Sequence, residues 1–431
     1  MRIYNKIFPK ILGFVDKVNG TTVKEKADFL MNSQQWTKKD ILKYQNYKMR
    51  KVIKYCYNNI PYYNKTWKDL KINIDNIKTT NDLYKLPTIN KQIVKDNFKD
   101  ICEPNKQGFF KFTSGSTGEP TKFYVTKENL SWEYASLIRS WTSGGYKLGD
   151  KYVRLTLNKP TIKDKIKNYF INCVYLYSAE VNSETFKKYY EIINKSKIKM
   201  IIAYPSILYL FAEFIENSKL QALKLNMIST SGEILFPKMR EKIEKQFNCK
   251  ILDQYGLGGE QQNLAFQCNL AKLYHLNPEH NIVEIDNQKN VLITTLNNFK
   301  MPLIRYKTGD KAIKTHKKCK CGRNLPVIEE IIGRETDTIY TKNNFLIVHF
   351  FTILFEYICG VEQFQIKQKK IDEVQVLLKV NSKFTKKDET NIIFKIKEAS
   401  NNELKIKIKY VDNIPLAKSG KRRFIISEIK K

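Results

Sequence analysis

The spacing of hydrophobic and polar residues changes twice along this chain of 431 residues. In its first hundred residues, hydrophobic positions recur at helical spacing over 45–57 and again over 80–84. Ile60-Pro61 interrupts the first of these stretches and Leu86-Pro87 follows the second. Because proline cannot continue a helix, this pattern predicts a region of short helices over 1–105.

From about residue 110 to residue 310, short runs rich in β-branched residues alternate with amphipathic stretches. The runs predict strands and the stretches between them predict helices. We expect strands at 152–157, 200–203, 227–229 and 250–252, and helices at 207–216 and 237–246. This alternation is typical of layered α/β domains with mainly parallel strands, so the predicted fold class is α/β.

The pattern changes again after Gly333-Arg334. We expect a buried helix over the apolar stretch 345–359, strands at 361–367, 373–380 and 404–411, and a polar helix at 386–399. About a hundred residues with this mixture form a small α+β domain. The predicted domains are therefore a large N-terminal domain over 1–333 and a small C-terminal domain over 334–431.

Charge narrows the range of partners. The 76 Lys and Arg residues outnumber the 43 Asp and Glu residues, which gives a net charge of +33, but only ten of the cations are arginines. Proteins that read nucleic-acid sequence rely on arginine, and here lysine is spread through every segment, so we expect no specific nucleic-acid partner. Peripheral contact with an anionic membrane stays open as an alternative.

We expect a cytoplasmic protein without a transmembrane segment. Charges interrupt every apolar run in the first 20 residues, so we expect no signal peptide, and the stretch 345–359 is too short to span a bilayer. The eight cysteines are then reduced, and those that cluster point to a metal rather than to disulfides.

A glycine-rich loop over 112–122, with the sequence FTSGSTGEPTK, carries the first candidate chemistry. Backbone N–H groups of such a loop can approach an anion closely, the hydroxyls add donors, and Lys122 adds a mobile positive charge. The loop lacks the spacing of a Walker motif, and taken alone it could equally be a surface turn. The candidate phosphate ligands are Thr113, Ser114, Gly115, Ser116, Thr117 and Gly118.

Further motifs follow this loop in an order that resembles the adenylate-forming superfamily of acyl-CoA synthetases and their relatives. Residues 230–233 resemble its adenine-contacting turn, 253–256 its aromatic adenine motif, 305–310 its ribose-binding motif, 333–337 its hinge, and Ser419-Gly420-Lys421 its catalytic lysine. The chain is most similar to the phenylacetate–CoA ligase-like branch that includes the CapK capsular-polysaccharide proteins. This resemblance covers nearly the whole chain.

The resemblance implies ATP and Mg²⁺ as cofactors and a role for each motif. Lys421 and Lys122 would be catalytic, Asp337 would mark the hinge, and 334–431 would be a mobile lid. Asp310 can accept hydrogen bonds from both ribose hydroxyls, and Tyr255 offers a flat face to adenine. The nucleotide-binding set is completed by Gly232, Glu233, Asp253, Gln254, Gly256 and Arg334. Lys418, Arg422 and Arg423 are alternatives to Lys421, and an interdomain salt bridge is the alternative role for Arg334 and Asp337.

One motif departs from the family pattern. The family's Tyr-Gly-x-Thr-Glu becomes Tyr255-Gly-Leu-Gly-Gly-Glu260, with one extra residue and no hydroxyl. Glu260 is the candidate Mg²⁺ ligand, because carboxylate oxygens suit this ion. Either the glycines let the loop bulge so that Glu260 returns to its place, or the metal and phosphate contacts are altered.

Two cysteines at a C-x-C spacing, Cys319 and Cys321, suggest a second metal site. With Cys268 and His275 they would complete a Cys₃His set, which is a closed tetrahedral zinc site and therefore structural rather than catalytic. His316 is a rival nitrogen ligand, and ordinary reduced cysteines are the alternative.

The resemblance implies an enzyme, an adenylate-forming ligase that converts a small carboxylic acid to acyl-AMP. The acyl group would then pass to a thiol or an amine, with CoA as the expected acceptor. One alternative is a CapK-type enzyme of surface polysaccharide assembly with an amine or sugar acceptor. Another is an inactive nucleotide-binding module, which the altered segment 257–260 favours.

Overall fold

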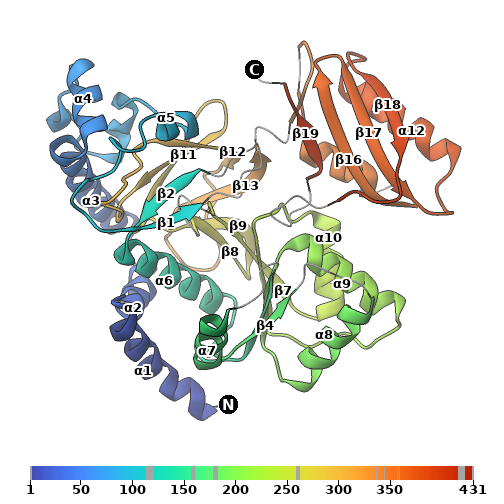
Figure 1. Cartoon of the computed structure of the whole chain (residues 1–431), viewed down its shortest axis with the longest axis horizontal. Helices are drawn as coiled ribbons and strands as arrows, with labels where there is room; N and C mark the ends of the chain where they lie inside the picture. The colour runs from blue at the N-terminus through green and yellow to red at the C-terminus, as the bar shows by residue number, and fades with distance from the viewer. Residues whose placement is uncertain are drawn as a thin grey trace.

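The computed structural model describes residues 2–112, 121–156, 161–177, 183–258, 263–334, 338–343, 345–356, 358, 360–415 and 423–429. The two main sheets have 11 and four strands, and helices pack around them. Figure 1 shows α3–α5 at the upper left, the antiparallel strands between them and the centre, α8–α10 at the lower right, and the four-stranded sheet at the upper right.

The first hundred residues are helical, as predicted. Their elements are α1 (Arg2–Asn19), α2 (Val23–Ser33), α3 (Lys38–Asn59), α4 (Pro61–Asp69), η1 (Ile74–Asn76), η2 (Thr80–Lys85) and α5 (Lys91–Asp96). A capping box between Thr37 and Asp40 starts α3. Pro61 ends the run of α3 and occupies the first turn of α4, where its missing N–H costs no hydrogen bond.

Five strands of the large sheet are parallel and match the predicted alternation of strands and helices. They are β3 (Tyr152–Thr156), β4 (Cys173–Tyr177), β5 (Met200–Ala203), β6 (Met227–Ser231) and β7 (Lys250–Tyr255). The helices that follow them are α7 (Ile162–Phe170), α8 (Ser183–Lys195), α9 (Pro205–Asn217) and α10 (Pro237–Phe247). The predicted strands and helices of this region are all present.

The other half of the sheet is antiparallel, which differs from the mainly parallel sheet expected. It contains β8 (Ala265–Cys268), β9 (Ala271–Leu276), β10 (Asn281–Ile285), β11 (Asn290–Thr295), β12 (Tyr306–Lys314) and β13 (Val327–Arg334). Their connections are too short to hold crossover helices, and short connections require antiparallel neighbours. The hairpin β1 (Phe109–Phe112) and β2 (Lys122–Val125) precedes α6 (Lys127–Ser143).

The C-terminal part begins with the hairpin β14 (Thr338–Tyr340) and β15 (Phe345–Ile347), followed by α11 (Val348–Glu356). The prediction of one helix over 345–359 is therefore wrong in its first three residues, because Phe345–Ile347 pair with β14. The four-stranded sheet has the order β18-β17-β16-β19. Its elements are β16 (Val361–Lys370), β17 (Glu373–Val380), α12 (Lys386–Ala399), β18 (Lys405–Tyr410) and β19 (Ile425–Ser427).

The largest apolar cluster joins the parallel half of the large sheet to the C-terminal part. The rings of Phe236 and Phe424 meet edge to face with centroids 5.6 Å apart. At the end of β13, Gly333 has φ +119° and lies against Ile234, whose Cδ1 would be 2.8 Å from an added Cβ. A side chain at this position would strain the backbone at this φ and would require Ile234 to shift, so the end of β13 and the loop after β6 are closely packed.

A second cluster fills the space between α3, α4 and the antiparallel strands. Among the described residues, no helix combines the length and the apolar character needed to cross a bilayer.

Candidate active site

The carboxyl ends of β6 and β7 carry two of the predicted nucleotide motifs. These strands are parallel neighbours, with Thr230 opposite Asp253 and Ser231 opposite Gln254. The carboxyl ends of neighbouring parallel strands meet at one edge of a sheet, where ligands bind in α/β folds. Gly232, with φ +81°, therefore leaves the sheet beside Gly256.

Asp253 is a buried carboxylate with both oxygens engaged by the protein. The Thr230 hydroxyl donates to Oδ1 at 2.5 Å, and the Tyr274 hydroxyl donates to Oδ2 at 2.5 Å. Burial raises the pKa of Asp253, and these two hydrogen bonds oppose the shift. The neighbouring Gln254 donates from Nε2 to Ser140 Oγ at 2.7 Å. The structure thus gives both residues protein contacts that fix the ends of β6 and β7.

Tyr255 and Asp310 connect the two halves of the large sheet. The Tyr255 hydroxyl, at the end of β7, donates to Asp310 Oδ2 on β12 at 2.9 Å. The two residues are 8% and 6% exposed, so water weakens this hydrogen bond little. The predicted adenine motif and the predicted ribose motif are therefore in direct contact, although 55 residues separate them in sequence.

Arg334 lies opposite Asp310 in the antiparallel pair of β12 and β13. The preceding Gly333 packs against Ile234, the residue after Glu233. The turn at 230–233, the aromatic motif, the ribose motif and the first residues of the hinge motif thus converge at one place. Asp337 lies outside the described residues.

Glu233 is held by the first turn of α9. Its Oε2 accepts the backbone N–H of Ser206 at 3.0 Å, and its Oε1 accepts the Ser206 hydroxyl at 3.1 Å. A carboxylate is stabilised at a helix N-terminus, where backbone N–H groups lack partners. The contact fixes the loop after β6 to α9, and no sequence motif indicated Ser206 as the partner of Glu233.

The hairpin β1–β2 carries the glycine-rich loop. Phe112 lies opposite Lys122 at the end of the hairpin, and Thr113–Gly118 themselves lie outside the described residues. Phe123 packs edge to face on Tyr306 of β12, with centroids 6.0 Å apart. The loop end of the hairpin therefore lies against the strand that carries Asp310. Lys122 is exposed, with Nζ 5.8 Å from the Phe110 ring centroid.

Two further predicted residues, Glu260 and Lys421, also lie outside the described residues. Their roles as Mg²⁺ ligand and catalytic lysine stay predictions from the motifs.

Arg305, the first residue of the ribose motif, has a structural contact. Its guanidinium pairs with Glu284 at 3.1 Å and donates to the Leu86 carbonyl at 2.7 Å. Burial raises the pKa of Glu284, and the guanidinium opposes this shift. Arg305 therefore ties the segment after η2 to β10.

Four side chains form the cluster predicted as a zinc site. The ligand atoms of Cys268, His275, Cys319 and Cys321 all lie within 4.8 Å of one another. The sulfurs of Cys268 and Cys319 are 3.4 Å apart, and Cys321 Sγ is 3.4 Å from His275 Nε2. The rival ligand His316 is exposed and is not a member of the cluster.

The cluster has the ligand chemistry of a zinc site, and its two shortest separations lie near the spacing that such an ion requires. A tetrahedral ion bound at ~2.3 Å by sulfur and ~2.0 Å by nitrogen separates its ligand atoms by roughly 3.5–3.8 Å. Burial lowers the pKa of His275 to about 4, which keeps the imidazole neutral, as a metal ligand must be. Cys268 and His275 lie on the β8–β9 hairpin, whereas Cys319 and Cys321 lie in the loop between β12 and β13.

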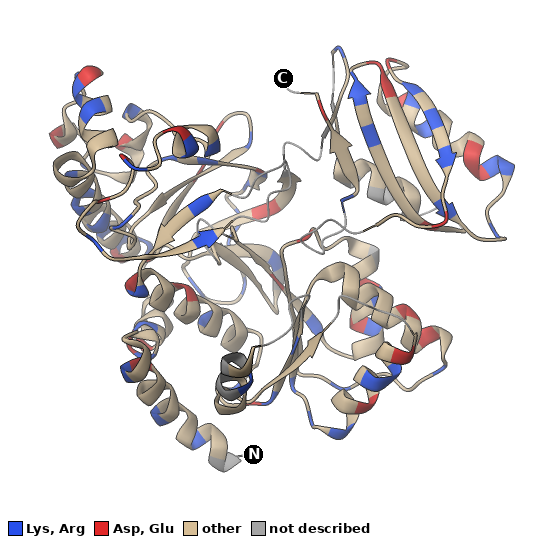
Figure 2. Cartoon of the chain, in the orientation of Figure 1, with Lys and Arg blue, Asp and Glu red and all other residues tan. Residues whose placement is uncertain are grey.

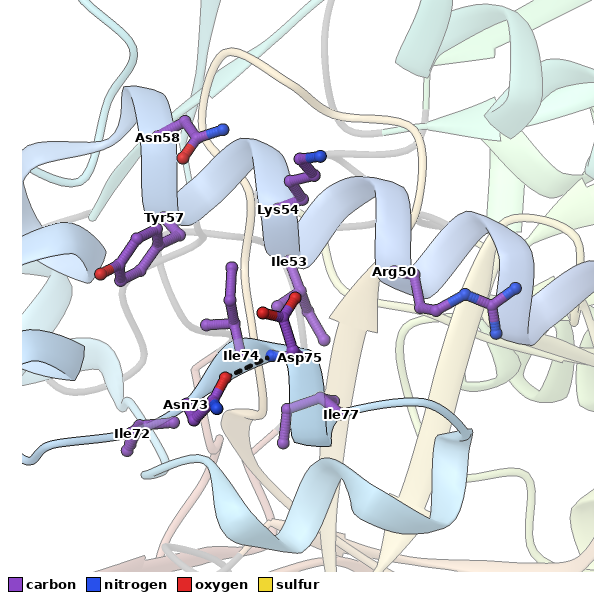
Figure 3. A pocket seen from close by; sticks show the side chains of 10 residues that line it. All are labelled: Arg50, Ile53, Lys54, Tyr57, Asn58, Ile72, Asn73, Ile74, Asp75 and Ile77. Atoms are coloured by element: carbon purple, nitrogen blue, oxygen red, sulfur yellow. Dashed lines mark hydrogen bonds between the residues drawn. The ribbon is translucent and has the colours of Figure 1, made fainter.

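A cavity of about 480 Å³ lies elsewhere, between α3 and the segment around η1 (Figure 3). Ile53, Ile74 and Ile77 line it, with Arg50 and Lys54 among its polar neighbours. None of the predicted site residues contributes to its wall. This cavity is therefore separate from the candidate active site.

Comparison with known proteins gives relatives for most of the chain. Residues 339–428 match the family model of the CapK C-terminal domain. Protein CapK of Staphylococcus aureus is 26% identical over 425 residues, which cover 91% of this chain and 90% of that protein. Phenylacetate-coenzyme A ligase of Pseudomonas putida is 23% identical over 317 residues, covering 68% of this chain and 71% of that enzyme.

The fold is also that of solved ligases. A 2-hydroxyisobutyryl-CoA ligase in the postadenylation state, in complex with R3-HIB-AMP, has a TM-score of 0.69, with 17% identity and 92% of each chain covered. The predicted α/β fold class is confirmed. The relatives with a named activity and this structural neighbour are CoA ligases of the adenylate-forming kind, and the predicted resemblance to the branch of phenylacetate–CoA ligases and CapK is confirmed.

Proposed function

We propose that this chain activates a small carboxylic acid with ATP as an acyl-adenylate and then transfers the acyl group to CoA. Its similarity to phenylacetate–CoA ligases and to the fold of a CoA ligase solved with an acyl-AMP supports this reaction. The observation that carries the proposal is the hydrogen bond between Tyr255 and Asp310, with Arg334 on the neighbouring strand. ATP and CoA are both available in the cytoplasm, where we propose that the enzyme acts.

In this site the nucleoside would lie at the strand ends. The Tyr255 ring would stack on adenine, and Asp310 would accept the ribose hydroxyls, since a carboxylate offers an acceptor to each of two neighbouring donors. Tyr255 orients that carboxylate through its hydroxyl before the nucleotide binds. Gly232, Glu233, Asp253, Gln254 and Gly256 would shape the adenine pocket.

The triphosphate would lie against the glycine-rich loop, Thr113–Gly118, with Lys122 at its edge. Glu260 would hold Mg²⁺, which supplies charge neutralisation on the phosphates. Lys421 would reach the acid and the α-phosphate from the C-terminal domain.

Two bond exchanges give the products. A carboxylate oxygen bonds to the α-phosphorus while the bond to the bridging oxygen breaks, and pyrophosphate leaves. The thiolate of CoA then bonds to the acyl carbon, and AMP leaves with the electron pair of the anhydride bond. Because two anionic groups, the carboxylate and the α-phosphate, meet in the first step, positioning and the Lys421 ammonium would carry most of the catalysis.

We also propose the domain organisation on which this chemistry depends. Residues 1–333 would bind the nucleotide, and 334–431 would act as a lid that turns about a hinge marked by Asp337. A hinge is a few residues that absorb a large change in backbone angles, and Gly333 suits that use.

The Cys268, His275, Cys319 and Cys321 cluster would hold a structural zinc ion. Four protein ligands leave no open position, so the ion would take no part in the reaction. It would fasten the loop 315–326 to the β8–β9 hairpin. This loop joins β12, which carries Asp310, to β13, which carries Arg334.

A second candidate function is a CapK-type ligase with an amine or sugar acceptor in surface polysaccharide assembly. Two findings favour it: residues 339–428 match the CapK C-terminal domain, and the alignment to protein CapK covers nearly the whole of both chains. It shares the adenylation step and differs only in the acceptor.

Carboxylate-dependent exchange of pyrophosphate into ATP tests the common step. With Mg²⁺-ATP at saturation and a panel of aryl and short-chain acids, we expect exchange with at least one acid and none with Lys421→Ala. Adding CoA or an amino sugar to the active mixture then separates the two candidate functions by product. If no acid in the panel supports exchange, the proposed ligase activity is refuted and the chain is better described as a nucleotide-binding module.

A further inference from the structure

Helix α1 exposes a strip of large apolar side chains. Ile7, Phe14 and Val18 are 46%, 67% and 69% exposed. Positions seven and four apart lie on one side of a helix, so these three side chains form a single strip. Large exposed apolar surfaces mark interaction sites when they are contiguous and bordered by polar residues.

A strip of lysines runs beside the apolar strip. Lys6, Lys10 and Lys17 are all exposed and share one side of the helix, about 100° around from Ile7 and Val18. In Figure 2, basic positions, drawn in blue, recur along α1. Asp16, the only carboxylate of α1, is buried and accepts the backbone N–H groups of Val23 and Lys24 at 3.0 Å and 2.8 Å. The outward side of α1 is therefore positively charged.

The opposite side of α1 is anchored to the protein. Phe8 is 5% exposed and packs so closely on Gly149 that an added Cβ there would lie 2.9 Å from it. Asn5 Nδ2 donates to the Leu148 carbonyl at 3.0 Å and to Asp150 Oδ1 at 2.9 Å. These contacts fix which side of α1 faces outward.

Helix α7, which contacts α1, also exposes large apolar side chains. Ile162, Tyr169 and Phe170 are 77%, 81% and 50% exposed. The Tyr4 hydroxyl donates to the Phe170 carbonyl at 2.7 Å, so the two helices are in contact at the end of the molecule that carries the N-terminus (Figure 1). We call the outward side of α1 together with Ile162, Tyr169 and Phe170 the α1–α7 face.

We propose that the α1–α7 face binds the surface of an anionic lipid bilayer. Apolar and aromatic side chains beside lysines are the composition of helices that lie in the headgroup region. The lysines would meet lipid phosphates, and the net charge of +33 would draw the whole protein to an anionic surface. The inference is independent of the proposed ligase activity.

Charge argues against a second copy of this chain as the occupant. A symmetric dimer would place the same face against itself, and thus bring Lys6, Lys10 and Lys17 close to their own counterparts. An anionic surface instead complements them. The helix would lie on the membrane without spanning it, in keeping with its amphipathic character.

Cosedimentation of the full chain with vesicles tests the inference. We expect binding to vesicles of phosphatidylcholine and phosphatidylglycerol, little binding to pure phosphatidylcholine, and weaker binding at about 0.5 M NaCl. The double variant Phe14→Ser/Val18→Ser should lower the partition coefficient on the order of tenfold, because two apolar anchors are lost. The triple variant Lys6→Gln/Lys10→Gln/Lys17→Gln should lower it at least as far.

Matched controls replace equally exposed residues elsewhere. Tyr84→Ser/Phe394→Ser removes two exposed aromatic side chains, and Lys195→Gln/Lys245→Gln/Lys386→Gln removes three exposed charges. Both should bind vesicles within about twofold of the wild type. Circular dichroism should show the same fold in all variants, and pyrophosphate exchange should not change in the α1 variants, since they lie outside the proposed active site.

Three results would overturn the inference. One is no difference between anionic and neutral vesicles. Another is an equal loss of binding in the α1 variants and in their matched controls, which would mean a general charge effect. The third is a wild-type dimer in sedimentation velocity that Phe14→Ser/Val18→Ser converts to monomer, since the α1–α7 face would then be an interface between copies.

Discussion

Replacing Tyr255 by Phe removes one hydroxyl from the candidate active site and keeps the ring. That hydroxyl donates to Asp310 Oδ2 at 2.9 Å in a place where both residues are almost fully buried. A hydrogen bond to a charged group contributes about 1.5–3 kcal/mol to stability. We therefore expect Tyr255→Phe to lower the free energy of unfolding by about 2 kcal/mol.

The same substitution should weaken nucleotide binding without abolishing it. The ring still stacks on adenine, but Asp310 is no longer oriented toward the ribose. A loss of about 1.4 kcal/mol in binding corresponds to a tenfold rise in the AMP dissociation constant. Asp310→Ala removes the acceptor of both ribose hydroxyls, and at about 1.5 kcal/mol for each hydrogen bond it should cost on the order of a hundredfold.

Calorimetric titration with AMP and unfolding in urea measure the two effects separately. Tyr146→Phe is the matched control, because its buried hydroxyl donates to the Asp150 carbonyl at 2.9 Å and both residues lie outside the site motifs. It should lose about 1 kcal/mol of stability and keep the wild-type AMP affinity. The reasoning is refuted if Tyr255→Phe also keeps that affinity while losing stability.

Four further predictions concern other parts of the account. Lys421→Ala should abolish acid-dependent pyrophosphate exchange and spare ATP binding in calorimetry; exchange at the wild-type rate would discard this lysine. Elemental analysis should find one zinc ion per chain, lost in Cys321→Ser and kept in Cys102→Ser, and a metal-free wild type would contradict the site. Gly333→Ala should lower the free energy of unfolding in urea by about 1–2 kcal/mol, because φ is +119° at this position and an added Cβ would lie too close to Ile234. Wild-type stability of this variant would show that the backbone adjusts without strain. Burial raises the pKa of Asp253 above its usual 3.8, so the folded protein holds the carboxyl proton more tightly than the unfolded chain does. The stability of the wild type relative to Asp253→Asn, measured by urea unfolding, should therefore fall as pH rises from about 3.8 through the folded pKa and then level off. A stability difference that does not change with pH would contradict this.

Sequence patterns predicted the helices and parallel strands well because both depend on local periodicity. The runs at 200–203 and 227–229 are strands in the structure, and the capping box at Thr385 starts the predicted polar helix. The antiparallel half was not predicted, since strand direction depends on the connections rather than on the strands themselves.

The motifs predicted which residues belong to the candidate site but not what their side chains contact. Asp253 reads as a nucleotide contact in sequence, yet both of its oxygens accept hydroxyls from other strands. Arg305 lies within the ribose motif, yet it pairs with Glu284. Ser206 holds Glu233 through a helix N-terminus. These partners come from distant segments, and no local spacing encodes them.

The central claim is that nucleotide binds where the end of β7 meets β12. A crystal of the protein soaked with AMP tests it directly. The account predicts ribose hydroxyls within hydrogen-bond distance of the Asp310 carboxylate and adenine against the Tyr255 ring. The claim would be contradicted by AMP bound away from Asp310, with the Tyr255–Asp310 hydrogen bond unchanged and no nucleotide against either residue.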